Sequence, residues 1–175
     1  MDRRSILKGF AMAGVGLAML SGGAEAQRKG KKKEEGGVNP KLITGHWSLV
    51  SAETVRADGT HAQPFGPNPA GVAVFAPNRR FSISVVNPDM PKFASNNQDA
   101  GTDDENRAVA RGSITYFGTY RLASDGTLSL EIEGSSFPNW NKVDQMRMVT
   151  SLTANELKWT ATGDRGGTAE LAWKK

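Results

Sequence analysis

Apolar and polar residues alternate with a period of two along most of the chain after residue 45, which indicates β-strands that each bury one face. The segment 80–86 shows the pattern most clearly, because Phe81, Ile83 and Val85 alternate with two serines and a valine. Turn-forming residues separate each such segment from the next. The pattern predicts eight strands, at residues 46–55, 71–76, 80–86, 113–123, 128–133, 143–152, 156–162 and 168–174.

The same alternation predicts which side chains face the core. In the first strand, Trp47, Leu49 and Ser51 share one face. In the last two strands, Trp159 and Trp173 lie on apolar faces and are expected in the core. The fourth strand has the longest such face, made of Ile114, Tyr116, Gly118, Tyr120 and Leu122.

Because every predicted strand has one apolar face, a single sheet can close on itself and leave no open edge. The expected fold is all-β, an antiparallel barrel of eight strands, or of nine if residues 59–65 add a short strand. A sandwich of two sheets is the alternative. One short helix is expected after Thr102, which forms a capping box with Glu105, and Gly112 is expected to end it. This helix and its preceding loop either cover one mouth of the barrel or serve only as a connection.

The first 26 residues are typical of an export signal, with a basic start, a short apolar stretch, and Ala24 and Ala26 at the predicted cleavage site. The apolar stretch is too short to span a bilayer as a helix. Arg3 and Arg4 stand in the sequence RRSILK, which resembles the twin-arginine export motif. A general secretory signal with a chance arginine pair is the alternative. We therefore expect a periplasmic or secreted protein that is cleaved after Ala26.

The net charge of +4 at pH 7 lies outside the predicted barrel. Residues 1–26 carry +1 and residues 27–37 carry +3, whereas the rest of the chain holds 14 basic and 14 acidic residues. We expect a signal peptide at 1–26, a basic disordered linker at 27–40 and one barrel domain at 41–175. The basic residues 28–33 either contact a membrane surface weakly or form a solvated spacer. A neutral barrel argues against a nucleic-acid partner.

The chain contains no cysteine and two histidines, His46 and His61. The absence of cysteine excludes disulfides, thiolate metal sites and a cysteine nucleophile. The scarcity of histidine disfavours a histidine-rich metal site and Ser-His-Asp catalysis, so we expect neither a metal nor a cofactor. Glu131 and Glu133 share the face opposite the apolar residues of their strand, so they are expected to be solvated rather than a catalytic carboxylate pair.

The stretch EGSSFPNW, residues 133–140, is the densest candidate for a site. Pro138 restricts its backbone, so the stretch is either only a corner between two strands or also a binding surface. A corner between antiparallel strands must lie at a barrel end, and the strand order brings Tyr116 nearer to it than Tyr120. The candidate ligand-binding residues are Tyr116, Tyr120, Asn139, Trp140 and Arg147.

The orientation of Arg147 stays open at this point. Arg147 stands between Met146 and Met148, so the period of two places it on the face opposite to them. If the methionines face the core, Arg147 faces solvent. If Arg147 faces the core, it is a buried cation that needs a carboxylate or an anionic ligand.

Four motifs occur in order and resemble the bacterial and fungal lipocalin-like domain family: LITGHWSLVSAETVRADGT, PFGPNPAGVAVFAPNRRFSISV, YFGTYRL and EGSSFPNW…DQMRM. The resemblance covers residues 41–174. It implies a lipocalin-like barrel that holds a small hydrophobic or amphipathic ligand, and it implies no reaction. In such barrels Gly45 and Trp47 would correspond to the structural plug of the closed end, and Lys174 to the basic residue that covers the tryptophan.

Three functions remain open. The first is an exported, non-enzymatic binder of a small hydrophobic or amphipathic molecule. The second is a barrel enzyme of the isomerase or cyclase type that uses Tyr116, Tyr120 or Arg147 on a hydrophobic substrate. The third is a packed structural or interaction module. An apolar pocket with a few convergent polar groups would favour the first two.

We predict that replacing Arg3 and Arg4 by lysine blocks export, because the twin-arginine route recognises the arginine pair and not its charge alone. N-terminal sequencing of wild-type envelope material should begin at Gln27. Replacement of Lys8 by arginine is the control and should leave export unchanged. Normal export of the double-lysine variant would leave the general secretory route.

Overall fold

The computed structural model describes residues 37–162 and 167–175, and every structural statement below concerns these residues. The predicted signal residues Arg3, Arg4, Ala24 and Ala26 lie outside this part of the chain, and so does the basic segment 28–33.

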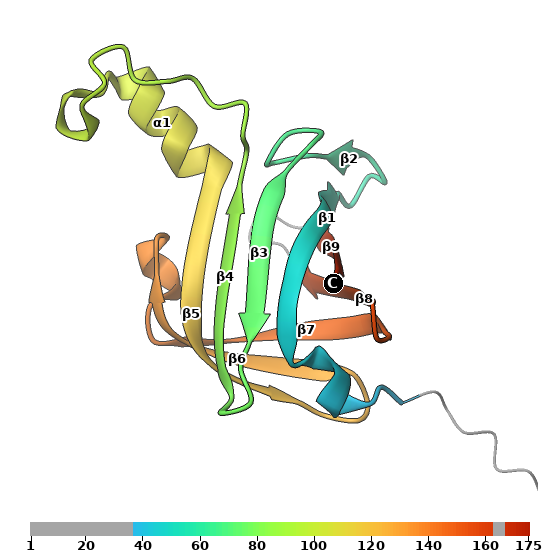
Figure 1. Cartoon of the computed structure of the whole chain (residues 1–175). Helices are drawn as coiled ribbons and strands as arrows, with labels where there is room; N and C mark the ends of the chain where they lie inside the picture. The colour runs from blue at the N-terminus through green and yellow to red at the C-terminus, as the bar shows by residue number, and fades with distance from the viewer. Residues whose placement is uncertain (1–36, 163–166) are drawn as a thin grey trace, which may run out of the picture. The chain divides into compact units, whose positions relative to one another are not determined.

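The described residues form one antiparallel sheet that closes into a barrel (Figure 1). Its strands are β1 (Gly45–Val55), β2 (His61–Ala62), β3 (Ala70–Phe75), β4 (Arg80–Val86), β5 (Ser113–Leu122), β6 (Thr127–Ser135), β7 (Val143–Leu152), β8 (Glu156–Thr162) and β9 (Thr168–Lys174). From β3 to β9 each strand pairs with the next, and β1 pairs with both β3 and β9. This pairing closes an eight-stranded barrel, as predicted, and excludes the two-sheet sandwich. The ninth strand, β2, pairs only with the end of β1.

The helix α1 (Asp103–Gly112) begins after Thr102 with the predicted capping box and continues directly into β5. Most of its side chains are exposed. Three short 3-10 helices complete the secondary structure of this part of the chain: η1 (Pro40–Ile43), η2 (Gln98–Ala100) and η3 (Pro138–Trp140). Among the helices described, none combines the length and the apolar character needed to cross a membrane.

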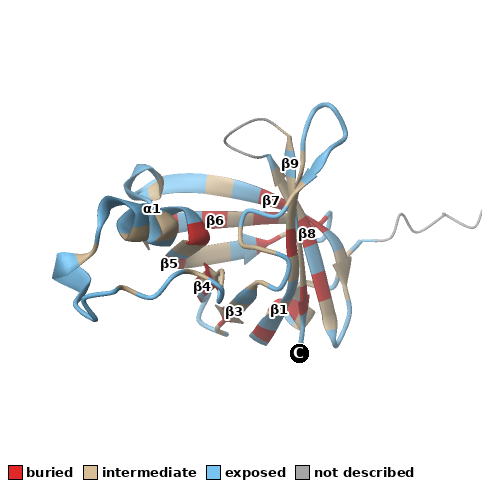
Figure 2. Cartoon of the chain, turned by 90° about the horizontal axis from the view of Figure 1, so that it is seen from above, coloured by how far each residue is buried: buried red, intermediate tan, exposed pale blue. Residues whose placement is uncertain are grey.

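The core lies inside the barrel, and buried residues alternate with exposed residues along the strands (Figure 2). The apolar faces predicted for 80–86 and 128–133 are buried throughout. Trp159 and Trp173 are also buried, as predicted. The alternation was therefore a sound guide to the core in the regular strands.

The first strand departs from strict alternation. A bulge between Leu49 and Ser51 shifts the register of β1 against β9. After the bulge Ala52 is the buried residue, with 3% of its surface exposed, and Ser51 is only half-buried. The prediction that Ser51 shares the buried face of Trp47 was wrong, because one extra residue in a strand reverses the parity of all that follow.

Trp47 fills one end of the barrel, which we call the base. Its side chain has no exposed surface, and its indole Nε1 donates a 2.7 Å hydrogen bond to the carbonyl of Ile43 in η1. Gly45 precedes it with a φ of 131°, a conformation that favours glycine. Trp47 is thus buried at one end of the barrel, and its role with Gly45 as the plug of that end stays a prediction.

The family resemblance implied that Lys174 covers Trp47. In the structure the basic residue over the Trp47 ring is Lys175. The Lys175 ammonium lies 4.4 Å from the centroid of the Trp47 ring. It also donates 3.1 Å hydrogen bonds to the carbonyls of Leu42 and Thr44. Lys174 is still within β9, where strand pairing directs its side chain away from the core. One ammonium therefore joins the last residue of the chain to the entry of β1.

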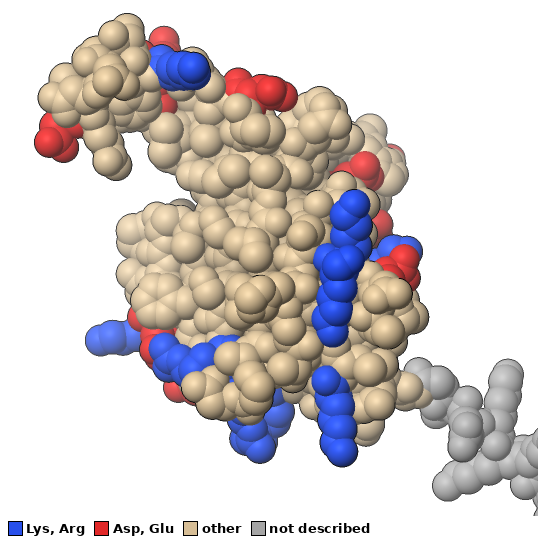
Figure 3. Space-filling model, in the orientation of Figure 1, with Lys and Arg blue, Asp and Glu red and all other residues tan. Residues whose placement is uncertain are grey.

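Charged side chains are unevenly distributed over the surface. On the face shown in Figure 3, the Lys and Arg side chains lie in separate groups, most of them in the half of the domain away from α1. Wide uncharged surface separates these groups on that face.

We predict that Trp47→Ala lowers the free energy of unfolding by about 3–5 kcal/mol, because it removes a fully buried indole and its hydrogen bond. Urea denaturation followed by circular dichroism measures the loss. Trp140→Ala is the matched control and should lose much less, since Trp140 is only half-buried. Equal unfolding midpoints for Trp47→Ala and the wild type would show that Trp47 is not the plug.

Candidate functional site

The stretch around η3 is an ordered corner at the end of the barrel opposite the base, which we call the mouth. It joins the end of β6 to the start of β7. The Ser135 amide donates a 2.7 Å hydrogen bond to Asn141 Oδ1, and the Ser136 amide donates a 2.8 Å bond to the Thr115 carbonyl. Lys142 completes the turn with a φ of 61°. The corner therefore holds Trp140 in a defined position beside the start of β5.

Arg147 faces the interior of the barrel. Only 8% of its surface is exposed, whereas Met146 and Met148 are 63% and 47% exposed. The register of β7 against β6 explains this orientation, because Arg147 pairs with the fully buried Leu128. The structure thus answers the question that the sequence left open.

The described partners of Arg147 are all uncharged. One guanidinium nitrogen donates to Gln145 Oε1, and the other donates a 2.9 Å bond to the carbonyl of Met146. The guanidinium carbon lies 5.9 Å from the centroid of the Trp140 ring. Within residues 37–162 and 167–175, no carboxylate forms an ion pair with it. A buried cation without a counter-ion is costly and is therefore a strong indication of a site.

Tyr116 lies next to this cation. It is 5% exposed, and its ring makes edge contacts with Trp140 at 5.3 Å and with Phe81 at 5.9 Å between centroids. Burial raises the pKa of the Tyr116 phenol above its ordinary value, and the neighbouring Arg147 opposes that rise without reversing it. Tyr116 is therefore a neutral hydroxyl at physiological pH.

The structure brings three of the five predicted residues together. Tyr116, Trp140 and Arg147 meet at the mouth, and Gln145 joins them; we call these four residues the mouth cluster. Sequence reasoning missed Gln145. The signal was available, because Gln145 stands two residues before Arg147 on the same strand and must share its face.

The other two predicted residues lie apart from this cluster. The Tyr120 hydroxyl donates a 3.1 Å hydrogen bond to the carbonyl of Ala76, and its ring contacts Phe75 at 5.0 Å. This places Tyr120 toward the base, where it supports the turn between β3 and β4. Asn139 is exposed on η3. Tyr116 is thus the tyrosine nearer to the corner, as the strand order predicted.

A series of aromatic contacts runs from the mouth to the base. Successive ring centroids lie 5.1–6.3 Å apart along Phe137, Trp140, Tyr116, Phe81, Phe75, Trp159 and Trp173. The indole Nε1 atoms of Trp159 and Trp173 are buried and have no hydrogen-bond partner among the described residues. These two indole N–H groups are therefore unsatisfied donors among the described residues.

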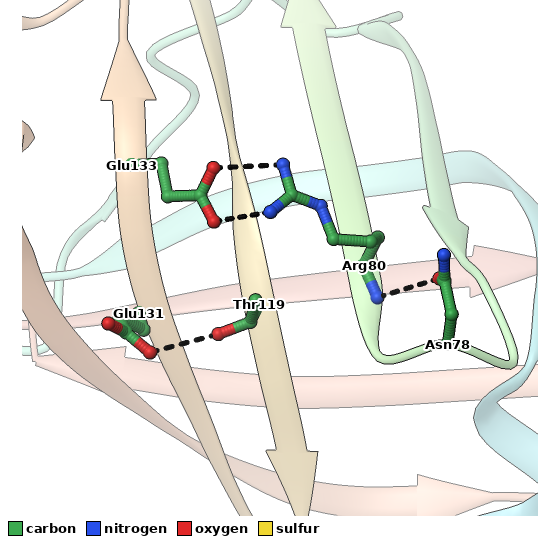
Figure 4. Close-up of polar contacts among 5 residues, drawn as sticks. All are labelled: Asn78, Arg80, Thr119, Glu131 and Glu133. Atoms are coloured by element: carbon green, nitrogen blue, oxygen red, sulfur yellow. Dashed lines mark hydrogen bonds and ion pairs between the residues drawn. The ribbon is translucent and has the colours of Figure 1, made fainter.

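The acidic residues of β6 belong to the outer surface (Figure 4). Glu133 forms a two-point ion pair with Arg80, and Glu131 accepts a 3.0 Å hydrogen bond from Thr119. Both glutamates are exposed, as predicted, and each has a different partner. In the described part of the chain, no group of three or more His, Asp or Glu side chains is placed to hold a metal ion.

The outer face of β5, β6 and β7 also carries an open groove of about 510 Å³. Four charged side chains line it, Arg79, Arg121, Glu131 and Asp144, and Gln145 of the mouth cluster also reaches it. Such a surface suits water better than an apolar ligand. The mouth cluster is therefore the better candidate site.

Comparison with known proteins identifies the family. The model of the lipocalin-like domain matches residues 44–175. No curated protein matches the chain. Similar solved structures include a lipocalin-like protein from Bacteroides uniformis, which is 17% identical with a TM-score of 0.44 and aligns over 77% of this chain and 98% of its own.

A redesigned β-barrel bound to DFHBI is also similar, at 18% identity and a TM-score of 0.39, over 78% of this chain and 97% of its own. These structural likenesses are distant, so the family assignment rests on the domain match. That match extends from the residue before β1 to the residue after β9 and agrees with the resemblance seen in the motifs. The chain belongs to the lipocalin-like domain family.

Proposed function

We propose that this protein is exported and binds a small hydrophobic or amphipathic molecule at the mouth of its barrel. The observation that carries the proposal is the burial of Arg147 beside Tyr116 and Trp140, without a carboxylate partner among the described residues. Charged side chains are almost never fully buried without a partner of opposite charge, and the exceptions cluster at functional sites. The lipocalin-like barrel is an architecture that can enclose one small ligand.

Partly exposed apolar side chains supply a surface for the ligand body. Leu49, Ile114 and Leu171 stand on the inward faces of their strands, and Phe65 lies between β2 and β3. All four pack against the core but retain exposed surface. The base differs, because its large side chains are fully buried. The mouth half of the barrel therefore offers the apolar contact that such a ligand needs.

The chemistry of the mouth cluster favours binding over catalysis. A general acid or base works best when its pKa lies near the working pH. Burial instead raises the pKa of Tyr116 above its ordinary value, and an arginine does not lose its proton in proteins. Both groups can donate hydrogen bonds to a bound molecule, which is what a binding protein requires.

The cellular location is part of the same proposal. The twin-arginine-type start and the small residues Ala24 and Ala26 support export to the cell envelope or beyond. A protein exported by that route reaches its compartment already folded, so its binding site would be complete on arrival.

We predict that the mature protein binds the neutral fluorescent probe N-phenyl-1-naphthylamine and that Trp140→Ala weakens binding about two- to tenfold. The loss of an aromatic contact of about 0.5–1.5 kcal/mol accounts for that change. Fluorescence titration measures it. Phe117→Ala is the matched control, because Phe117 is an exposed aromatic on the outer face of β5. If the wild type does not bind the probe, the barrel is a packed structural module. If all three proteins bind it equally, Trp140 does not contact the ligand and the proposed site at the mouth is wrong.

A further inference from the structure

We infer that the mouth cluster is a subsite for a carboxylate, so that the ligand is a monoanionic amphipathic acid. In this arrangement the carboxylate oxygens accept hydrogen bonds from the Arg147 guanidinium and the Tyr116 hydroxyl, with Gln145 orienting the guanidinium. The inference rests on the proposed function and specifies the head group of its ligand.

The hydrogen-bond capacity of Arg147 is the first step. A guanidinium has five N–H donors in a planar fork. Its acceptors include Gln145 Oε1 and the carbonyl of Met146, and the Tyr116 hydroxyl also lies beside it. Both acceptors are neutral. They use some of the N–H donors of the guanidinium, but they do not balance its positive charge. A carboxylate supplies two oxygens in the matching geometry together with the missing negative charge.

The surroundings of the cation are the second step. The neighbours of Arg147 include Leu128 on β6, Tyr116 on β5 and Trp140 on η3, and these three are uncharged. Arg147 is 8% exposed, so water solvates it poorly. An ionic attraction is stronger in such a place than at the surface. An anion therefore gains more from this cation than from the exposed lysines and arginines of the outer face.

The excess of donors over acceptors is the third step. The mouth cluster offers the Arg147 guanidinium and the neutral Tyr116 hydroxyl as hydrogen-bond donors. A ligand whose polar end only donates hydrogen bonds would leave these groups unsatisfied. A carboxylate only accepts hydrogen bonds, so it can satisfy these donors.

The packing of the barrel decides where the rest of the ligand lies. The base is filled by Trp47, Phe75 and Trp173, which have at most 1% of their surface exposed. The apolar body must therefore extend from Arg147 toward the mouth, along Ile114 and the ring of Trp140. A chain of moderate length, such as that of dodecanoate, provides a suitable probe.

The test compares dodecanoate with methyl dodecanoate, which has the same chain and acceptor atoms but no charge. Displacement of N-phenyl-1-naphthylamine measures both affinities. We expect the wild type to prefer the acid by about tenfold or more, as a charge-assisted hydrogen bond predicts. Arg147→Met should abolish the preference and still bind the neutral probe. Tyr116→Phe should reduce the preference by a smaller factor.

Arg121→Met is the matched control, because it removes the same charge from the exposed face of β5 and should keep the preference. Arg147→Met should fold, since an apolar residue of similar length often replaces a buried charge without loss of stability. Circular dichroism checks this. If it does not fold, Arg147→Lys keeps the charge but loses the planar fork, and the preference should fall severalfold.

The outcomes separate the two proposals. If the wild type binds the neutral probe but binds acid and ester equally, the carboxylate subsite is refuted and the binding function stands. The same conclusion follows if folded Arg147→Met retains the preference. If the wild type binds neither the probe nor dodecanoate, both proposals are wrong.

Discussion

The pairing of β1 with β9 is the interaction on which the rest of this structure depends. It joins the first and last of the eight barrel strands and turns an open sheet into a barrel. Once the sheet is closed, every inward side chain must share one limited interior, and every outward side chain meets solvent. The parity of a residue along its strand then decides its chemistry. Trp47 and Arg147 both point inward, so Trp47 lies in the core and Arg147 is buried near the mouth.

The two halves of the barrel use this interior in different ways. At the base, Trp47 is held by the carbonyl of Ile43 and covered by Lys175, so aromatic packing and hydrogen bonds reinforce one another. At the mouth, Arg147 is buried against neutral partners and gains no ion pair from the described residues. Proteins tolerate such local penalties where function requires them and the remaining packing offsets them. The stability gained from packing at the base therefore offsets the cost of burying the Arg147 charge at the mouth.

The sequence predicted the barrel well because its strands are regular. Four of the predicted strands, 80–86, 143–152, 156–162 and 168–174, have the bounds seen in the structure, since their apolar residues alternate regularly. The orientation of Arg147 could not be predicted in the same way. Its neighbours Met146 and Met148 are more apolar, so hydropathy alone would bury them, and only the pairing with β6 shows the reverse. The bulge that buries Ala52 likewise depends on contacts with β9.

The outward position of Met146 and Met148 has a consequence for oxidative damage. The chain contains no cysteine, so methionine sulfur is its main site of oxidation. Conversion to the sulfoxide adds a polar oxygen, which disrupts a protein when the sulfur is buried. On the exposed side of β7 that oxygen meets water instead. These two side chains can thus consume oxidants within a few residues of the guanidinium, while the interior of the barrel remains chemically unchanged.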